Sequence, residues 1–242
     1  MRVAVISDIH ANMEALQEVL ADIAQAGVDS IICLGDILGY GPNPEEAANL
    51  IRSLSIPTLM GNHELVLADP ELLEWFNDPA RESLLLSLRR IGRKTRDWLR
   101  GLDMRLVFEG ALFVHGSPPD SLTRYLFDWT DVELESLFQR LEQRLCFVGH
   151  THTPGAIAHD HGQIVHHRLK QGIFTLQGEA GYIISVGSVG QPRDGIDNSA
   201  KYVIWDRLRD TVEVRFVAYD AARTAEKIIA AGLPKEHARR LL

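Results

Sequence analysis

Five short stretches of the sequence carry metal-binding residue types in a fixed order. They are Asp8-Ile9-His10, Gly35-Asp36, Gly61-Asn62-His63-Glu64, His115-Gly116 and Gly149-His150-Thr151-His152. Each stretch follows a run of apolar, β-prone residues, such as Val3 to Ile6 before the first stretch. Ligand-type side chains at the ends of buried strands are where α/β proteins place their chemistry. The pattern therefore predicts a hydrolase that uses two metal ions.

The residue types also suggest how two cations would be shared. Two cations held close together need a bridging ligand, and a carboxylate has two oxygens for this purpose. Asp36 is the candidate bridge, because it lies between the first stretch and the later ones. We expect the remaining ligands to divide into two sets: Asp8, His10 and His152 for one ion, and Asn62, His115 and His150 for the other. Nitrogen and oxygen donors without a thiolate favour Mn, Fe, Co or Zn over Mg or Ca and do not choose among the four.

The charge of such a centre suits a phosphate. Two dications, two aspartates and a hydroxide that bridges the metals leave a net charge of about +1, which attracts a phosphate and stabilises its transition state. His63 is adjacent to Asn62, and neighbouring side chains on an extended segment point apart. We therefore expect His63 to protonate the leaving oxygen or to hydrogen-bond the phosphoryl group. Glu64 either orients His63 or caps the following turn.

Strands and helices alternate along the first part of the chain, which favours parallel strands covered by helices. The pattern predicts strands at 3–7, 31–34 and 57–60 and helices at 12–26 and 44–54, with Asn12 as a cap and Gly27 as a stop. Residues 65–101 read as helical, as a packing layer, a lid or a dimer surface. A hairpin at Glu109-Gly110 and a helix at 131–144 follow.

The remaining sequence predicts a second sheet and two final helices. Its strands are expected at 155–158, 163–169, 173–176, 182–186, 201–206 and 211–217, and its helices at about 220–231 and 234–242. No linker or repeat interrupts the chain, so we expect one domain, 1–242, with the C-terminal helices packed on it.

Composition limits the class of protein. At 242 residues and 45% hydrophobic, the chain can bury a large core. A formal charge of −8 disfavours a nucleic-acid polymer as partner. No apolar run approaches ~18 residues, which argues against a membrane partner and for a cytoplasmic protein. Cys33 and Cys146 fall in expected core strands and are read as reduced packing residues. The composition is compatible with either a monomer or a homo-oligomer.

The ordered motifs resemble the calcineurin-like metallophosphoesterase superfamily, over residues 8 to 152. The segment Gly187 to Arg193 further resembles the small bacterial branch described as phosphodiesterases. The resemblance implies an α/β fold in four layers, an α/β/β/α sandwich of two mixed β-sheets flanked by helices, and a site with two ions, often Mn, Fe, Ni or Zn. It also implies His63 as the catalytic histidine and seven metal ligands: Asp8, His10, Asp36, Asn62, His115, His150 and His152.

Two departures from the family pattern bear on the substrate. Glu64 stands where many relatives have aspartate, as it does in the Ser/Thr protein phosphatase branch. The second motif runs from Gly35 through Asp36 to Gly41 and lacks the Asp-Arg pair of those phosphatases, which use that arginine on phosphate. A dedicated phosphoprotein phosphatase is therefore disfavoured.

Three other features have two readings each, and two more have one. The histidines at 159, 161, 166 and 167 form either a second metal site or a hairpin that turns at Asp160-His161-Gly162, and the hairpin is favoured. Arg193 either contacts substrate phosphate or pairs with Asp194. Residues 117–129 form a wall of the site or ordinary core cover. The tail from Lys235 to Arg240 reads as a solvated helix face. Asn12 joins Arg193 as a candidate substrate contact.

The sequence thus predicts a dimetal phosphoesterase that hydrolyses a small phosphodiester or nucleotide-like substrate through a metal-bridging hydroxide. Within the same superfamily, the alternatives are a phosphomonoesterase, a protein phosphatase or a nuclease. An alternative of another class is a scaffold that binds phosphate or a nucleotide without turning it over.

Overall fold

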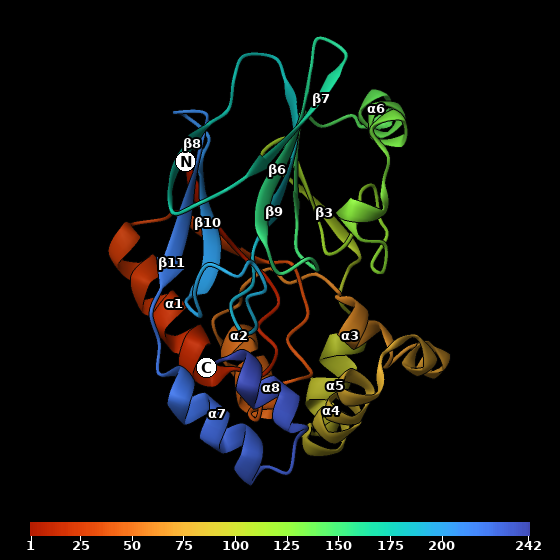
Figure 1. The fold of residues 1–242 in the computed structure, drawn as a ribbon, viewed down its shortest axis with the longest axis vertical. Coiled ribbons are helices and arrows are strands. Elements are labelled where there is room, and N and C mark those ends of the chain that lie inside the picture. The colour runs from red at the N-terminus through yellow and green to blue at the C-terminus, as the bar shows by residue number, and fades with distance from the viewer.

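Two β-sheets lie face to face, and helices cover the outer face of each sheet (Figure 1). The computed structural model describes residues 1–242. The first sheet has the strand order β2-β1-β10-β11-β8 and consists of β1 (Arg2–Ile6), β2 (Ser30–Cys33), β8 (Gly172–Thr175), β10 (Ala200–Asp206) and β11 (Thr211–Val217). The second sheet has the order β3-β4-β5-β9-β6-β7 and consists of β3 (Arg105–Phe108), β4 (Ala111–Val114), β5 (Leu145–Val148), β6 (Pro154–Asp160), β7 (Gln163–Arg168) and β9 (Gly181–Val186).

The alternation of side chains along β1 shows how the layers pack. Val3 and Val5 face the second sheet, where they join a cluster that includes Phe147. Ala4 and Ile6 face the opposite way, into the cluster beneath the helices. Because successive strand side chains point to opposite faces, a strand buried on both sides must be apolar throughout. The predicted four-layer α/β/β/α sandwich is confirmed.

Local sequence signals set the helix ends. The cap at Asn12 and the stop at Gly27, whose φ is +65°, bound α1 as predicted. The α-helices are α1 (Met13–Ala26), α2 (Pro44–Ser53), α3 (Asn62–Leu65), α4 (Asp78–Arg90), α5 (Arg93–Arg100), α6 (Asp131–Arg140), α7 (Ala221–Ala230) and α8 (Lys235–Arg240). Two 3₁₀ helices, η1 (Pro70–Trp75) and η2 (Leu126–Asp128), complete the set. The segment 65–101 is mostly helical, as predicted, but Pro70, Pro79 and Gly92 divide it.

The prediction that the late strands build a sheet of their own is wrong. Strands β8, β10 and β11 join β1 and β2, while β6, β7 and β9 join β3, β4 and β5. Strand β10 pairs antiparallel with β1 and is buried along its whole length, because it lies in the middle of its sheet. Both sheets therefore contain early and late parts of the chain.

The prediction of a strand at 57–60 is also wrong. Only isolated bridges form there, from Thr58 to Cys33 and from Leu59 to Asp103. Pro57 has no N–H to donate to a neighbouring strand, so regular pairing is interrupted at its start. The segment nevertheless runs beside β2, since the amide of Leu59 donates to the carbonyl oxygen of Cys33 at 2.8 Å.

Several finer predictions are confirmed. Glu109 and Gly110 both have positive φ in the tight turn between β3 and β4. The histidine-rich segment is the β6–β7 hairpin, which turns at His161 and Gly162. Cys33 and Cys146 are buried free thiols. None of the helices is both long and apolar enough to span a membrane.

Asn12 holds three elements together, which yields a stability prediction. Its Oδ1 accepts from the Ala15 amide and the Thr224 hydroxyl, both at 3.1 Å, and its Nδ2 donates to the Gly190 carbonyl at 3.0 Å. The Asn12→Ala variant loses a helix cap and two further buried bonds, so we expect about 2–4 kcal/mol lower unfolding free energy. Urea denaturation measures the change. The matched control is Asn77→Ala, which removes an N-cap bond of the same 3.1 Å length and should cost about 1 kcal/mol. Equal losses in the two variants would contradict the linking role.

Candidate metal centre

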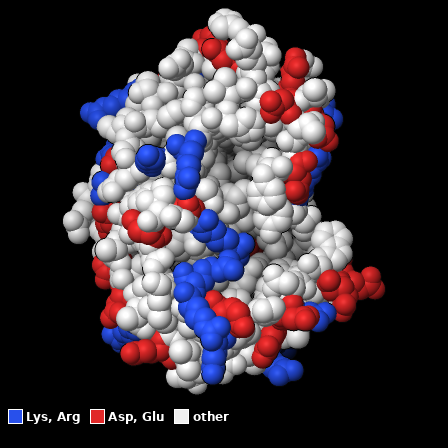
Figure 2. All heavy atoms as spheres, viewed as in Figure 1, with Lys and Arg blue, Asp and Glu red and all other residues white.

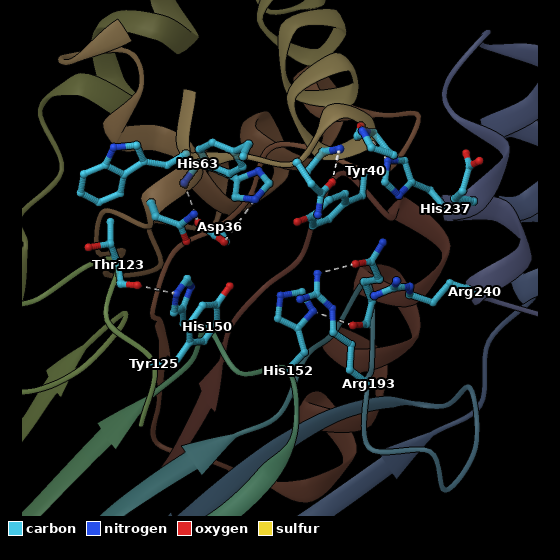
Figure 3. A pocket seen from close by; sticks show the side chains of 18 of the residues that line it. Asp36, Tyr40, His63, Thr123, Tyr125, His150, His152, Arg193, His237 and Arg240 are labelled. Atoms are coloured by element: carbon cyan, nitrogen blue, oxygen red, sulfur yellow. Dashed lines mark hydrogen bonds and ion pairs between the residues drawn. The ribbon is translucent and has the colours of Figure 1, made fainter. Parts of the chain in front are cut away.

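The five motif stretches converge where β1, β2, β4 and β5 end, at the junction of the two sheets. Figure 3 shows Asp36, His63, His150 and His152 facing one pocket from different elements. Asp36 comes from the loop after β2, His63 from α3, and His150 and His152 from the loop after β5. Since both sheets direct these loops to the same junction, residues 142 positions apart, such as His10 and His152, approach within 3.2 Å at their Nε2 atoms.

The Asp36 carboxylate lies at the centre of the cluster. Its Oδ2 is 3.4 Å from Nε2 of His115 and 3.8 Å from Nε2 of both His10 and His63. Its Oδ1 accepts the backbone amide of His63 at 2.9 Å, which fixes the orientation of the carboxylate. One oxygen of Asp36 is therefore shared among the histidines on both sides of the site.

Backbone carbonyls orient three of the imidazoles. In each ring Nδ1 lies against a carbonyl oxygen and donates its proton to it, so Nε2 faces the cluster. The three pairs are His10 with Leu38 (2.9 Å), His115 with Leu34 (3.1 Å) and His152 with Gln191 (2.6 Å). With Nε2 deprotonated, this is the tautomer that coordination through Nε2 requires.

Asp8 has one oxygen that no protein group satisfies. Its Oδ2 accepts the backbone amide of His150 at 3.0 Å, while its Oδ1 is buried without a hydrogen-bond partner, 3.2 Å from Nε2 of His152. An orphaned carboxylate oxygen in a fully buried position is costly. A bound cation would satisfy it, so the residues present fit a metal.

The donor atoms fall into groups that resemble the two expected sets. Asp8, His10 and His152 form one group, and Asp36, His115 and His150 form another, each within 4.8 Å. Asn62 adds its Oδ1 at 3.0 Å from Nε2 of His115. His150 differs from the other rings, because its Nε2 lies 3.2 Å from the Thr123 carbonyl and its Nδ1 is left for the site.

The backbone is strained where the donors sit. Residues with positive φ are uncommon outside glycine and gather at functional sites. Five of the seven expected ligands adopt this conformation: Asp8 (54°), His10 (47°), Asp36 (54°), His150 (63°) and His152 (58°). The neighbouring glycines allow the close approach, since a Cβ on Gly149 would lie 2.0 Å from Ser7 Oγ. The fold thus holds the donors in place at a cost in backbone energy.

Burial and mutual charge control the protonation of the cluster. Burial alone would raise the pKa of Asp8 and Asp36, but the surrounding imidazoles outweigh it and hold both below their usual range. Burial would lower the pKa of His115, but Asp36 and Asp8 raise it to about 9. For His63 burial prevails over the Asp36 charge and lowers the pKa to about 4. Both carboxylates are thus ionised at neutral pH, and His63 is neutral.

Glu64 does not orient His63; it holds the Asp36 loop. Its Oε1 accepts the amides of Ile37 and Leu38, both at 3.0 Å, and its Oε2 accepts those of Asp36 (2.8 Å) and Gly61 (3.1 Å). Burial and the Asp36 charge raise the pKa of Glu64 to about 7. Four N–H donors aimed at the two oxygens favour the ionised form.

The donor cluster forms one end of a pocket of about 470 Å³. Arg193 lines this pocket and donates from Nη2 to Gln191 Oε1 at 2.8 Å, whereas Asp194 pairs with Lys201 at 3.3 Å. The expected wall is present in part, as Thr123 and Tyr125 line the pocket and the Tyr125 ring stacks on His150 at 3.9 Å. Asn12 is absent from the lining, and its polar atoms are occupied within the fold, so its expected substrate contact has no support in this geometry.

Sequence reasoning missed several lining residues, among them Tyr40, His237 and Arg240. The predicted solvated face is present, since Lys235, Arg239 and Arg240 are exposed, but the other face of α8 is buried and packs beside the pocket. His237 is buried, and its Nε2 lies 3.0 Å from the Pro79 carbonyl while its ring lies 4.8 Å from that of Tyr40. The run of basic residues in the tail was the available signal, but its partner surface lies far away in sequence.

Comparison with known proteins agrees with this geometry. The family model described as calcineurin-like phosphoesterase matches residues 1–154, which contain all seven expected ligands. The chain belongs to the calcineurin-like phosphoesterase family. Its membership makes it a metal-dependent phosphoester hydrolase, in a family that uses two metal ions and acts on small phosphoesters.

Relatives of this phosphoesterase match it along almost its whole length. An uncharacterized protein of Methanocaldococcus jannaschii is 37% identical over 239 residues, covering 96% of this chain and 94% of the relative. The crystal structure of a metallophosphoesterase from Sphaerobacter thermophilus matches with a TM-score of 0.85 at 33% identity, covering 100% of this chain and 98% of that one. A hypothetical protein from Pyrococcus horikoshii shares the fold, with a TM-score of 0.81 at 22% identity over 99% and 97% of the two chains.

Because Glu64 holds the Asp36 loop by hydrogen bonds, we expect the stability of the phosphoesterase to depend on the Glu64 carboxylate. In Glu64→Gln the amide NH₂ must face two N–H donors in either orientation, so we expect about 2–4 kcal/mol lower unfolding free energy and weaker metal retention. Denaturant unfolding and metal analysis of the purified variant measure both. The control is Glu18→Gln, on the exposed face of α1, which should match the wild type. Wild-type stability in Glu64→Gln would show that the loop does not depend on this carboxylate.

Proposed function

We propose that this chain hydrolyses a small phosphodiester or nucleotide-like substrate at the pocket beside Asp36. The observation that carries the proposal is the position of Asp36 Oδ2, which lies within 3.8 Å of histidine nitrogens from three motifs, two of them expected ligands. A carboxylate oxygen so placed suits a bridge between two cations. The family membership supplies the reaction class, and the pocket geometry supports the substrate size.

The proposed ligand sets follow the donor groups. Asp8, His10 and His152 would hold one ion, Asn62, His115 and His150 the other, and Asp36 both. Divalent metals bound there supply Lewis-acid stabilisation of the phosphoryl oxygens and an activated water as nucleophile. The ionised carboxylates described above are already in the protonation state that ligation needs, whereas His115, whose pKa is raised to about 9, would release a proton when it binds a metal.

His63 is proposed as the residue that assists the leaving group. Its Nε2 is 3.8 Å from Asp36 Oδ2, its Nδ1 has no partner, and its ring lines the pocket. The rings of Tyr40 and Phe76, each 4.9 Å away, hold the imidazole in place. As a neutral ring, His63 presents an N–H that can donate to the leaving oxygen as negative charge develops there.

The rest of the pocket supports a compact substrate. Its volume of about 470 Å³ lies in the range of small-molecule sites. Tyr125 offers an aromatic face, and Arg193 offers guanidinium donors near His152. A nucleotide-like substrate has a planar base and a phosphate that match these two groups. The net charge of −8 adds no attraction for a long polyanion.

A pair of chromogenic substrates tests the proposed reaction. The protein, supplied with Mn, Ni, Co or Zn, is assayed on bis-p-nitrophenyl phosphate and p-nitrophenyl phosphate, with Asp36→Ala as the blank. We expect faster turnover of the diester. Preference for the monoester would replace the diester proposal with a phosphomonoesterase. Absence of turnover on both, with every metal, would contradict catalysis and favour a binding role.

Two variants separate metal binding from the role of His63. Asp36→Ala removes the shared oxygen, so we expect loss of both ions and of activity. His63→Gln keeps every expected ligand, so we expect normal metal content and roughly 10²–10⁴-fold slower turnover, as for the loss of an acid–base group. Elemental analysis and steady-state kinetics on the same preparations make the comparison. Full activity of His63→Gln on an alkyl phosphodiester, which has a poor leaving group, would disprove the assigned role.

A further inference from the structure

Two arginines face the pocket without a carboxylate partner. Arg193 lies in the loop between β9 and β10, and Arg240 lies at the end of α8. Figure 3 shows Arg240 extending from α8 toward Arg193. Neither takes part in an ion pair; the Arg193 guanidinium donates to the neutral Gln191 side chain, and the Arg240 side chain makes no hydrogen bond. Two adjacent cations without a counter-charge repel each other and favour an anion between them.

Three acidic residues line the pocket and the depression beside it, and none of them forms an ion pair with either arginine. Among acidic residues in the lining, Asp36 belongs to the metal cluster, and Asp197 is held by Lys201 at 2.9 Å. Glu236 is exposed and forms no ion pair. The Arg193 Nε is buried with no hydrogen-bond partner, which leaves one donor of the guanidinium unsatisfied. Burial and the Arg193 charge also lower the pKa of Arg240, which agrees with their closeness.

The pair has a fixed position relative to the metal ligands. The Arg193 backbone amide donates to the His152 carbonyl at 3.2 Å, and its guanidinium carbon lies 5.5 Å from the Tyr40 ring centroid. Tyr40 in turn packs against His10 and His237, with ring centroids 4.4 and 4.8 Å away. The arginine subsite, Arg193 with Arg240, is therefore adjacent to the metal cluster but separate from its donor atoms.

The subsite also opens outward. A second depression of about 530 Å³ shares Arg193 and Arg240 with the first pocket. Figure 2 shows basic side chains running down this face over α8, beside a hollow, although the chain as a whole carries a charge of −8. Both arginines come from the part of the chain beyond residue 154, where the family model ends. This wall is thus added to the shared metal-binding part.

We propose that Arg193 and Arg240 bind a second phosphate group of the substrate, next to the phosphoester that is cleaved at the metal cluster. Guanidinium groups match phosphate oxygens by paired, charge-assisted hydrogen bonds, and a phosphate dianion balances two such charges. The inference rests on the proposed function of the same pocket and narrows its substrate class to bisphosphorylated compounds, in which an arm that carries a phosphate reaches toward the second depression.

A matched substrate pair tests the proposal. One substrate is the p-nitrophenyl ester of thymidine 5′-phosphate, and the other carries an added 3′-phosphate; in both, water replaces p-nitrophenolate at the 5′-phosphorus. We expect the wild type to prefer the bisphosphate by kcat/KM. Arg240→Gln should lower that preference about tenfold to a hundredfold, as for a lost charge-assisted bond. Arg239→Gln, the exposed neighbour on α8, serves as control and should keep the wild-type ratio.

Calorimetric titration with thymidine 3′,5′-bisphosphate and with thymidine 5′-phosphate gives a readout independent of turnover. Weaker binding of the bisphosphate to Arg240→Gln, with unchanged binding of the monophosphate, supports the subsite even if no ester is hydrolysed. The absence of hydrolysis would then count against the proposed function and not against the subsite. If both esters turn over with equal kcat/KM in the wild type, or if Arg240→Gln affects both compounds equally, the subsite is overturned while the proposed function stands. If Arg240→Gln changes inhibition by free inorganic phosphate but not the turnover or binding of the bisphosphate, a role of Arg240 in substrate binding is likewise overturned.

Discussion

The site depends on the way Glu64 holds the loop that carries Asp36. A buried carboxylate in the left-handed region of φ is unfavourable on two counts, desolvation and backbone strain. Glu64 compensates by accepting four backbone amides, three of them from Asp36, Ile37 and Leu38. Two neighbouring buried carboxylates repel each other, so the arrangement needs positive charge nearby. Metal ions at the donor cluster are the natural source of that charge.

The face-to-face packing of the two sheets explains why the donors meet. Asp8 and Asp36 follow strands of the first sheet, whereas His115 and His150 follow strands of the second. Neither sheet alone has a complete set. The centre therefore forms only when the sheets are packed, which couples metal affinity to the integrity of the core between them. The C-terminal part of the chain then adds the arginine subsite, so metal chemistry and substrate selection come from different parts of the sequence.

Local signals made much of this molecule predictable. The family, the four-layer fold, the limits of α1 and the hairpin at Glu109 and Gly110 were inferred correctly, because each depends on motifs or turn residues that are contiguous in sequence. The seven ligands stay a prediction, although the fold brings all of them together. The prediction of which sheet the late strands join was wrong. Strands β9 and β10 carry similar apolar patterns, and only their long-range pairing places them in different sheets. Arg240 was missed for a related reason: nothing in the tail's own sequence shows that α8 packs against the pocket.

The central claim is that Asp36 bridges two metal ions held by donors from both sheets. A crystal structure of the protein grown with Mn, with anomalous differences collected at the Mn edge, tests this claim most directly. We predict two anomalous peaks, one among Asp8, His10 and His152 and one among Asn62, His115 and His150, each within bonding distance of the Asp36 carboxylate. A single peak, or two peaks of which only one contacts Asp36, would contradict the account.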